Sequence, residues 1–247
     1  MFDQAIRLQT DNSMRRIRTI AKYIRRTPCH PQWLLPLQTL RSDTAGLAGK
    51  VLDVGCADRW VESRCLAGTQ YIGLDLPVTG KGLYAAVPDI FADAARLPLI
   101  DASIDAVVCL EVLEHVSHPQ AALAEFARVL KPGGVMIFSM PFMYPIHDAP
   151  YDFQRLTEYG LRRDLDAAGF DIVRMEKLGH AVHAAALLLC LALVGGLYER
   201  RRWFDYLRMP LVALGVLTVN VFASVVSWVT PDWSALGSGY EIHARRR

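Results

Sequence analysis

Short apolar runs alternate with stretches of helical periodicity between residues 50 and 176. The apolar runs are rich in Val, Ile and Leu, as in strands buried on both faces: KVLDVG, QYIGLDL, PDIFAD, IDAVVCL, VMIFSM and FDIVRME. The clearest helix is HPQAALAEFARVLKPGG, with Pro119 in its first turn and Pro132-Gly133-Gly134 as its stop. A second helix, TEYGLRRDLDAAGF, has Thr157 as its N-cap and Gly169 just past its end. This alternation predicts an α/β fold with a doubly wound, mostly parallel sheet.

The pattern changes after residue 177. Leu178–Tyr198 and Met209–Pro231 contain no Lys, Arg, Asp or Glu, and the charged stretch ERRRWFDYLR lies between them. GYEIHAR then alternates like a final strand. We therefore expect an apolar helical insertion over residues 178–236, before a last strand over 237–247 that completes the core of residues 31–177.

Both apolar stretches of the insertion are long enough to cross a bilayer. A spanning hairpin would place four arginines outside, against the positive-inside tendency. Asn220, Ser224 and Ser227 also form a weak polar stripe at helical spacing. The pattern favours helices that dip into one leaflet over helices buried in a core or dimer interface, and over a true spanning hairpin.

Residues 1–30 are predicted to form a basic amphipathic helix, centred on SMRRIRTIAKYIRR. Met14, Ile17, Ala21 and Ile24 form its apolar stripe, and most basic residues lie off that stripe. Such a helix either lies on an anionic membrane surface or packs on the main domain with its basic side in solvent. MFDQAIRLQTDN lacks the apolar region of a secretory signal peptide.

Net charge and cysteine content limit the kinds of partner and cofactor that we expect. The 247 residues carry a net charge of +2, which argues against a nucleic-acid partner. The five cysteines are odd in number and lack CxxC pairing, so we expect neither a disulfide framework nor a metal site. The cysteine pattern favours a cytoplasmic protein, and the apolar insertion places it at the inner face of the membrane. The sequence does not indicate whether the protein is a monomer or an oligomer.

Three acidic residues close three successive predicted strands. Asp53 and Gly55 follow the first strand, in VLDVGCADRW. Asp75 ends the next strand, 22 residues after Asp53, where a carboxylate can bind both hydroxyls of a ribose. Asp93 ends the third strand, where it can accept from an adenine amino group. Together they predict an adenosine pocket.

The first loop departs from a pyrophosphate-binding loop. Ala57 and Arg59 stand where such loops carry glycines that let the backbone approach a pyrophosphate. The loop therefore favours an adenosyl cofactor without phosphate, and it argues against an NAD or nucleotide-sugar enzyme.

Over residues 50–176 the chain resembles the class I S-adenosylmethionine-dependent methyltransferases of the small-molecule, type 11 kind. The resemblance rests on the order and spacing of VLDVGCA, YIGLDL, DAARLPLIDASIDAVVCLEVLEHV and ALAEFARVLKPGGVMIFSMP. It implies a Rossmann-like sheet of seven strands and S-adenosylmethionine as cofactor. It also implies site roles: Asp53, Gly55 and Ala57 near the methionine part, Asp75 and Leu76 at the ribose, Asp93 and Ala94 at the adenine, and Leu110 and Glu111 beside the methyl group.

Methyl transfer to a hydroxyl group can require a general base. We expect that base after the fourth or fifth strand. His147, in a loop bounded by prolines, is the first choice, and His115 and Asp148 are further candidates. His115 can instead simply pack on its helix, and Asp152 with Arg155 can be a structural ion pair.

The predicted function is methyl transfer from S-adenosylmethionine to an oxygen of a small or lipid-linked acceptor, amphiphilic or glycan-like. The alternative is a membrane-anchored partner protein that binds the adenosyl cofactor without catalysis.

Overall fold

The computed structural model describes residues 25, 27–35, 44, 46–77, 87–200 and 203–247, without the side chains of 198–206. The basic amphipathic helix predicted over residues 1–30, centred on 13–26, lies mostly outside the described residues. The chain divides into two compact units. One comprises Pro36–Leu178 and Ser238–Arg247, and the other comprises Gly179–Gly237 with the N-terminal segment up to Leu35.

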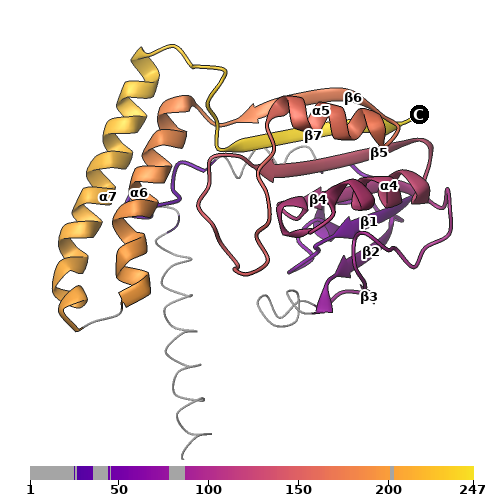
Figure 1. Cartoon of the computed structure of the whole chain (residues 1–247), viewed down its shortest axis with the longest axis horizontal. Helices are drawn as coiled ribbons and strands as arrows, with labels where there is room; N and C mark the ends of the chain where they lie inside the picture. Colours follow the sequence, from indigo (N-terminus) through magenta and orange to yellow (C-terminus); the bar gives the residue numbers. More distant parts are fainter. Residues whose placement is uncertain (1–24, 26, 36–43, 45, 78–86, 201–202) are drawn as a thin grey trace, which may run out of the picture. The chain divides into compact units, whose positions relative to one another are not determined.

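Seven strands of the described chain form one sheet in the first unit, in the order β3-β2-β1-β4-β5-β7-β6 (Figure 1). Neighbours from β3 to β5 are parallel, whereas β7 is antiparallel to both β5 and β6. This confirms the predicted fold, with its last strand inserted beside the fifth. The strands are β1 Lys50–Val54, β2 Gln70–Asp75, β3 Ile90–Phe91, β4 Ile104–Leu110, β5 Leu130–Pro141, β6 Phe170–Leu178 and β7 Gly239–Arg246.

The central strands are apolar because both faces of the sheet are covered. Leu52 packs in a cluster that includes Phe126 and Phe138, while its neighbour Val51 packs with Val108 in a second cluster. Helices α4 (Pro119–Val129) and α5 (Glu158–Ala167) contact each other on one face, as Figure 1 shows. Burial on two sides explains why these strands are continuous apolar runs rather than alternating ones.

The start of β5 differs from the expected pattern. Helix α4 ends at Val129 and β5 begins at Leu130, five residues before the predicted strand. Leu130 is already extended and pairs with Ile104, and the register shifts between Ile104 and Ala106, where the partner strand passes through its glycines. After β1 the chain forms a short 3₁₀ helix, η1, over Glu62–Arg64.

The second unit contains α6 (Ala181–Arg200) and α7 (Trp203–Val229). Their polar side chains meet between the helices: the His183 ring lies 2.9 Å from Ser227 Oγ, and Cys190 Sγ lies 3.5 Å from Asn220 Oδ1. Asn220 Nδ2 also donates to the carbonyls of Pro28 (2.7 Å) and His30 (3.0 Å). The polar stripe therefore faces inward within this unit.

Candidate functional site

A cavity of about 480 Å³ opens at the carboxyl ends of β1 to β4, the usual ligand position in an open parallel sheet. Nine residues were predicted to bind the cofactor, and eight of them line this cavity: Gly55, Ala57, Asp75, Leu76, Asp93, Ala94, Leu110 and Glu111. The ninth, Asp53, lies beneath the wall within β1. The loops that follow four different strands thus converge on one cavity.

The β1 loop keeps a glycine-like backbone with other residues in place of glycine. Gly55, Ala57 and Arg59 have φ angles of +73°, +42° and +58°, all in the left-handed region. At Gly55 a Cβ atom would lie 2.3 Å from Val112 Cγ2, so this position has no room for a side chain. Ala57 therefore adopts the conformation expected of glycine while adding only a methyl group to the wall.

The Arg59 side chain makes its bonds to neighbouring residues. Its Nε lies 2.9 Å from Glu62 Oε2, and its Nη1 lies 3.0 Å from Asp89 Oδ2. The guanidinium also lies over the Tyr71 ring, 4.8 Å from the ring centroid. Arg59 is not among the residues that line the cavity.

Asp75 ends β2 with its carboxylate already oriented. The Ala57 N–H donates to Oδ2 (3.2 Å) and the Leu76 N–H donates to Oδ1 (2.8 Å). Burial raises the pKa of Asp75, and these two backbone donors oppose that shift. Each oxygen retains a further lone pair, so the carboxylate can still accept from two vicinal hydroxyls.

Asp53 is almost fully buried, at 3% exposed, and the Tyr71 hydroxyl donates to its Oδ2 at 2.5 Å. Burial raises the pKa of Asp53 to about 7; the Tyr71 hydrogen bond lowers it, and the nearby Asp75 carboxylate raises it further. This carboxyl therefore changes its charge close to neutral pH.

The remaining predicted residues form the opposite side of the cavity. Asp93 follows β3, and its Oδ1 accepts from the Ala95 N–H at 2.9 Å. Glu111 follows β4 with a φ of +55°, unusual for a residue other than glycine. The Ser139 hydroxyl donates to Glu111 Oε1 at 2.8 Å, which fixes the side chain between β4 and β5.

Two of the three predicted catalytic residues line the cavity. His115 and Asp148 form part of its wall, and His147 is not among the lining residues. The His147 ring instead lies behind His115, with 4.8 Å between ring centroids. Burial lowers the pKa of His115, so its imidazole is neutral at pH 7.

The loop after β5 is held by an ion pair. Arg155 Nη1 lies 2.5 Å from Asp152 Oδ1, and Asp152 Oδ2 accepts the His147 N–H at 2.9 Å. The hydrogen bonds from Arg155 lower the pKa of Asp152 to about 2. This is the structural ion pair that the sequence offered as one interpretation of these two residues.

Several wall residues were not predicted. Trp60, Tyr151 and Phe153 supply aromatic surface to the cavity. The Phe153 N–H donates to the Glu114 carbonyl at 2.9 Å and so joins the loop to the segment after β4. In the sequence, the two aromatic residues of PYDF were the available signal for this part of the wall. Their position at the cavity depends on the loop after β5 folding back onto the segment after β4.

A family model described as "Methyltransferase domain" matches residues 52–138. Among curated proteins, the ubiquinone biosynthesis O-methyltransferase of Aromatoleum aromaticum is 37% identical over 108 residues, or 38% of this chain and 45% of that protein. The protein of the same name from Hahella chejuensis is 33% identical over 131 residues, or 46% of this chain and 55% of that protein. The matches thus span about half the length of these relatives.

Solved structures support the fold. An S-adenosylmethionine-dependent methyltransferase from Mesorhizobium loti is 18% identical with a TM-score of 0.51, over 87% of this chain and 98% of that one. The phosphoethanolamine N-methyltransferase 2 of Haemonchus contortus, solved with S-adenosyl-L-methionine, is 16% identical with a TM-score of 0.51, over 91% of this chain and 59% of that one.

The sheet order is that of the class I methyltransferase fold, and residues 52–138 match the methyltransferase-domain family.

Proposed function

We propose that this protein transfers the methyl group of S-adenosylmethionine to an oxygen atom of a small amphiphilic acceptor. The observation that carries the proposal is the convergence of eight predicted cofactor residues on one cavity, with acidic residues after β2, β3 and β4. Such a wall suits a nucleoside joined to a sulfonium cation and offers no cluster of glycines for a pyrophosphate. The O-methyltransferase names of the curated relatives support oxygen as the acceptor atom.

In the proposed reaction an acceptor oxygen attacks the methyl carbon in line with the carbon–sulfur bond. The C–O bond forms as the C–S bond breaks, and the C–S electron pair remains on sulfur to give S-adenosylhomocysteine. The hydroxyl proton passes to the protein, where His115 and Asp148 are the acceptors at the wall. Alignment of the two reactants can supply about 7–11 kcal/mol of the barrier reduction.

The cofactor assignment is tested by calorimetric titration of the full chain with S-adenosylhomocysteine, and with NAD as comparison. We expect one-site binding of S-adenosylhomocysteine and none of NAD, because the acidic wall suits an adenosyl group and lacks the glycines that a pyrophosphate requires. Binding of NAD but not S-adenosylhomocysteine would refute the assignment.

Catalysis is tested by incubating the protein with methyl-labelled cofactor and a lipid extract, followed by mass spectrometry of the products. We expect the added methyl group on an oxygen of a compound in the organic phase. Cofactor binding without label transfer to any extract would instead favour the non-catalytic partner protein.

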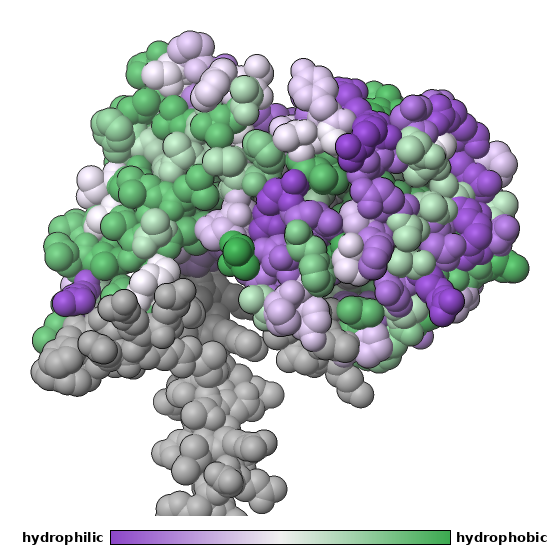
Figure 2. Space-filling model, viewed as in Figure 1, coloured by the Kyte–Doolittle hydropathy of each residue, from purple (hydrophilic) through white to green (hydrophobic). Residues whose placement is uncertain are grey.

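We further propose that α6 and α7 associate with the inner face of a membrane. The residues Leu207–Val229 form a helix long and apolar enough to cross a bilayer, and Ala181–Leu197 form a shorter apolar helix. Figure 2 shows an apolar, green surface over the region of α6 and α7. The exposed apolar side chains of α7 include Leu211 at 72%, Leu214 at 58%, Phe222 at 68% and Trp228 at 88% exposed. Polar side chains inside and apolar ones outside suit a lipid environment.

Membrane association is tested by fractionating cells that express the full chain, followed by a carbonate wash and detergent extraction. The double variant Leu211→Lys with Leu214→Lys should move protein into the soluble fraction. Val173→Lys is the matched control, because Val173 is 64% exposed on β6 of the methyltransferase unit. Equal membrane retention of the double variant and the control would contradict the proposal.

A further inference from the structure

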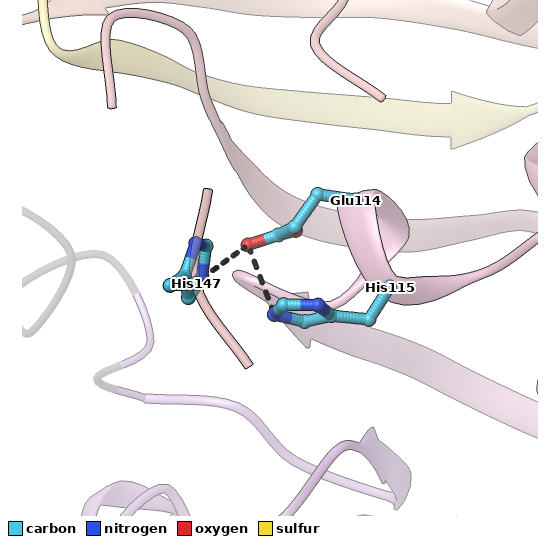
Figure 3. A group of neighbouring side chains, drawn as sticks. All are labelled: Glu114, His115 and His147. Carbon is cyan, nitrogen blue, oxygen red and sulfur yellow. Dashed lines mark ion pairs between the residues drawn. The ribbon is translucent and has the colours of Figure 1, made fainter. Parts of the chain in front are cut away.

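Three side chains next to the cofactor cavity point toward one position, as Figure 3 shows. Glu114 and His115 belong to the 3₁₀ helix η3 (Leu113–His115) after β4, and His147 belongs to the loop after β5. Glu114 Oε1 lies 3.7 Å from His115 Nε2 and 3.9 Å from His147 Nε2. The three candidate ligand atoms lie within 4.8 Å of one another.

Glu114 is the unusual member of this cluster. It is fully buried, and neither carboxylate oxygen has a hydrogen-bond partner among the described residues. The separations from the two imidazoles exceed hydrogen-bond length. A buried carboxylate without a partner is costly, so its position calls for a positively charged or donating group between it and the histidines.

In both histidines the Nδ1 atom, on the side of the ring away from Glu114, lies close to hydrogen-bond acceptors. His115 Nδ1 lies 2.7 Å from the Tyr151 carbonyl oxygen. His147 Nδ1 lies 3.2 Å from Asp152 Oδ2 and 3.3 Å from the Pro145 carbonyl, both acceptors and both closer than the Arg155 Nη2 donor at 3.4 Å. An Nδ1–H that donates to these oxygens leaves the Nε2 lone pair directed at Glu114.

We propose that Glu114, His115 and His147 form a binding site for a divalent transition-metal cation, of which Zn²⁺ is the representative. Two imidazoles and one carboxylate are a ligand set for zinc and similar metals, whereas magnesium and calcium prefer oxygen ligands. Anchoring of the non-ligating Nδ1 by a carboxylate or carbonyl is the usual outer-shell arrangement in such sites.

Metal binding requires the three side chains to move closer together. Tetrahedral Zn²⁺ with bonds of about 2.0–2.1 Å places its ligands about 3.3 Å apart. The two pairs that include Glu114, at 3.7 and 3.9 Å, would each shorten by about half an ångström, and the two histidine nitrogens, which lie within 4.8 Å of each other, would approach by up to about 1.5 Å. No cysteine takes part, so the cysteine spacing that argued against a metal in the sequence does not bear on this site.

The site has a consequence for the proposed methyl transfer and, in this respect, rests on that proposed function. Because His115 lines the cavity, a cation held by it would lie at the cavity wall with the fourth coordination position left for an acceptor oxygen. Coordination lowers the pKa of a bound hydroxyl group. His115 then acts as a ligand, and Asp148 receives the hydroxyl proton before the oxygen attacks the methyl carbon.

Metal binding is tested first without any reaction. The full chain, stripped with a chelator, is titrated with Zn²⁺ by calorimetry and with Co²⁺ by visible absorption. We expect one equivalent of each metal, with Co²⁺ bands typical of a nitrogen- and oxygen-ligated site. Glu114→Gln and His147→Ala should each weaken binding by at least about tenfold.

The matched control is His118→Ala, since His118 is an exposed histidine outside the cluster, with its Nδ1 2.9 Å from Ser117 Oγ. It should bind metal like the wild type, and S-adenosylhomocysteine binding should be retained by all variants as a check of folding. Absence of stoichiometric binding in the wild type, or unchanged binding in both Glu114→Gln and His147→Ala, would overturn the proposal.

The role of the cation is tested separately. Chelator treatment should lower methyl transfer at least tenfold while leaving S-adenosylhomocysteine affinity unchanged, and added Zn²⁺ should restore transfer. A protein that binds the metal but transfers equally well without it would overturn acceptor activation and leave the methyltransferase assignment intact. Loss of cofactor binding itself would count against the proposed function instead.

Discussion

The Tyr71 hydroxyl donates a 2.5 Å hydrogen bond to a carboxyl group, that of Asp53, which is buried inside β1. Tyr71 lies on the neighbouring strand β2, so this bond joins the two strands directly below the cofactor loop. The pair places an ionisable group with a pKa of about 7 under the cavity floor. Stability and cofactor binding should both respond to its charge.

The first prediction concerns Asp53→Asn. The pKa of Asp53 is about 7 in the folded protein and 3.8 for an unperturbed group, so the folded state binds more protons between these values. Its contribution to the free energy of unfolding therefore falls as the pH rises from about 4 to 7, by an amount on the order of 4 kcal/mol.

Asn cannot ionise, so Asp53→Asn should become more stable relative to the wild type as the pH rises. Urea unfolding of both proteins at pH 5 and pH 8, without cofactor, measures this difference. A gap that stays constant between the two pH values would show that Asp53 does not titrate in this range.

The second prediction concerns Asp75→Ala. The Asp75 carboxylate faces the cavity and is oriented by two backbone donors, so its removal should raise the dissociation constant of S-adenosylhomocysteine by at least tenfold, or about 1.4 kcal/mol. Calorimetric titration gives the constant. Asp171→Asn serves as control because the Asp171 side chain is 69% exposed at the start of β6, and its affinity should match the wild type.

The third prediction compares two glycines that share a left-handed backbone. Gly55 has φ +73° and no room for a Cβ atom, whereas Gly68 has φ +85° and no atom within 4 Å of the place that a Cβ would take. Both alanine variants carry the cost of a strained φ, about 1–2 kcal/mol. Gly55→Ala adds a collision with Val112, which lines the cavity.

We therefore expect Gly55→Ala to lose more stability than Gly68→Ala by at least about 1 kcal/mol, and to lose cofactor affinity as well. Thermal unfolding and S-adenosylhomocysteine titration measure the two effects. Equal stability losses in the two variants would mean that Val112 moves aside without cost.

The fourth prediction concerns Asn220→Ala in the second unit. The Asn220 amide satisfies the carbonyls of Pro28 and His30, and the residue is fully buried. Its removal leaves these carbonyls without their donor, at a cost of about 1–3 kcal/mol. Proteolysis in detergent should cut near residue 30 faster than in the wild type. Thr218→Ala on an exposed turn of the same helix should not, since Thr218 only bonds back to Leu214.

The sheet was predictable because burial on both faces leaves a strong mark on a sequence. Val51 and Leu52 pack in opposite clusters, so β1 had to be apolar throughout. The start of β5 was not predictable, because Gly133 and Gly134 favour a helix stop while the pairing of Leu130 with Ile104 already extends the chain. Long-range pairing outweighed the local glycine signal.

The convergence of the predicted cofactor residues on one cavity follows from the topology of the sheet. Parallel strands bring their carboxyl ends to one edge, so Asp75 and Asp93 had to meet there. The cluster of Glu114 with His147 was not predictable from the sequence. It forms because the loop after β5, which carries His147, folds back onto the segment after β4, which carries Glu114. The sequence placed Asn220 in a weak polar stripe, but it could not show what Asn220 binds, because the Pro28 and His30 carbonyls lie about 190 residues away in sequence.

The place of β7 sets an order of assembly during translation. This strand lies between β5 and β6, yet the ribosome makes it only after α6 and α7. Helices α6 and α7 thus leave the ribosomal exit tunnel before the sheet has the strand that lies between β5 and β6. A nascent chain stalled before Gly239 would contain both apolar helices but would lack the strand that joins β5 to β6.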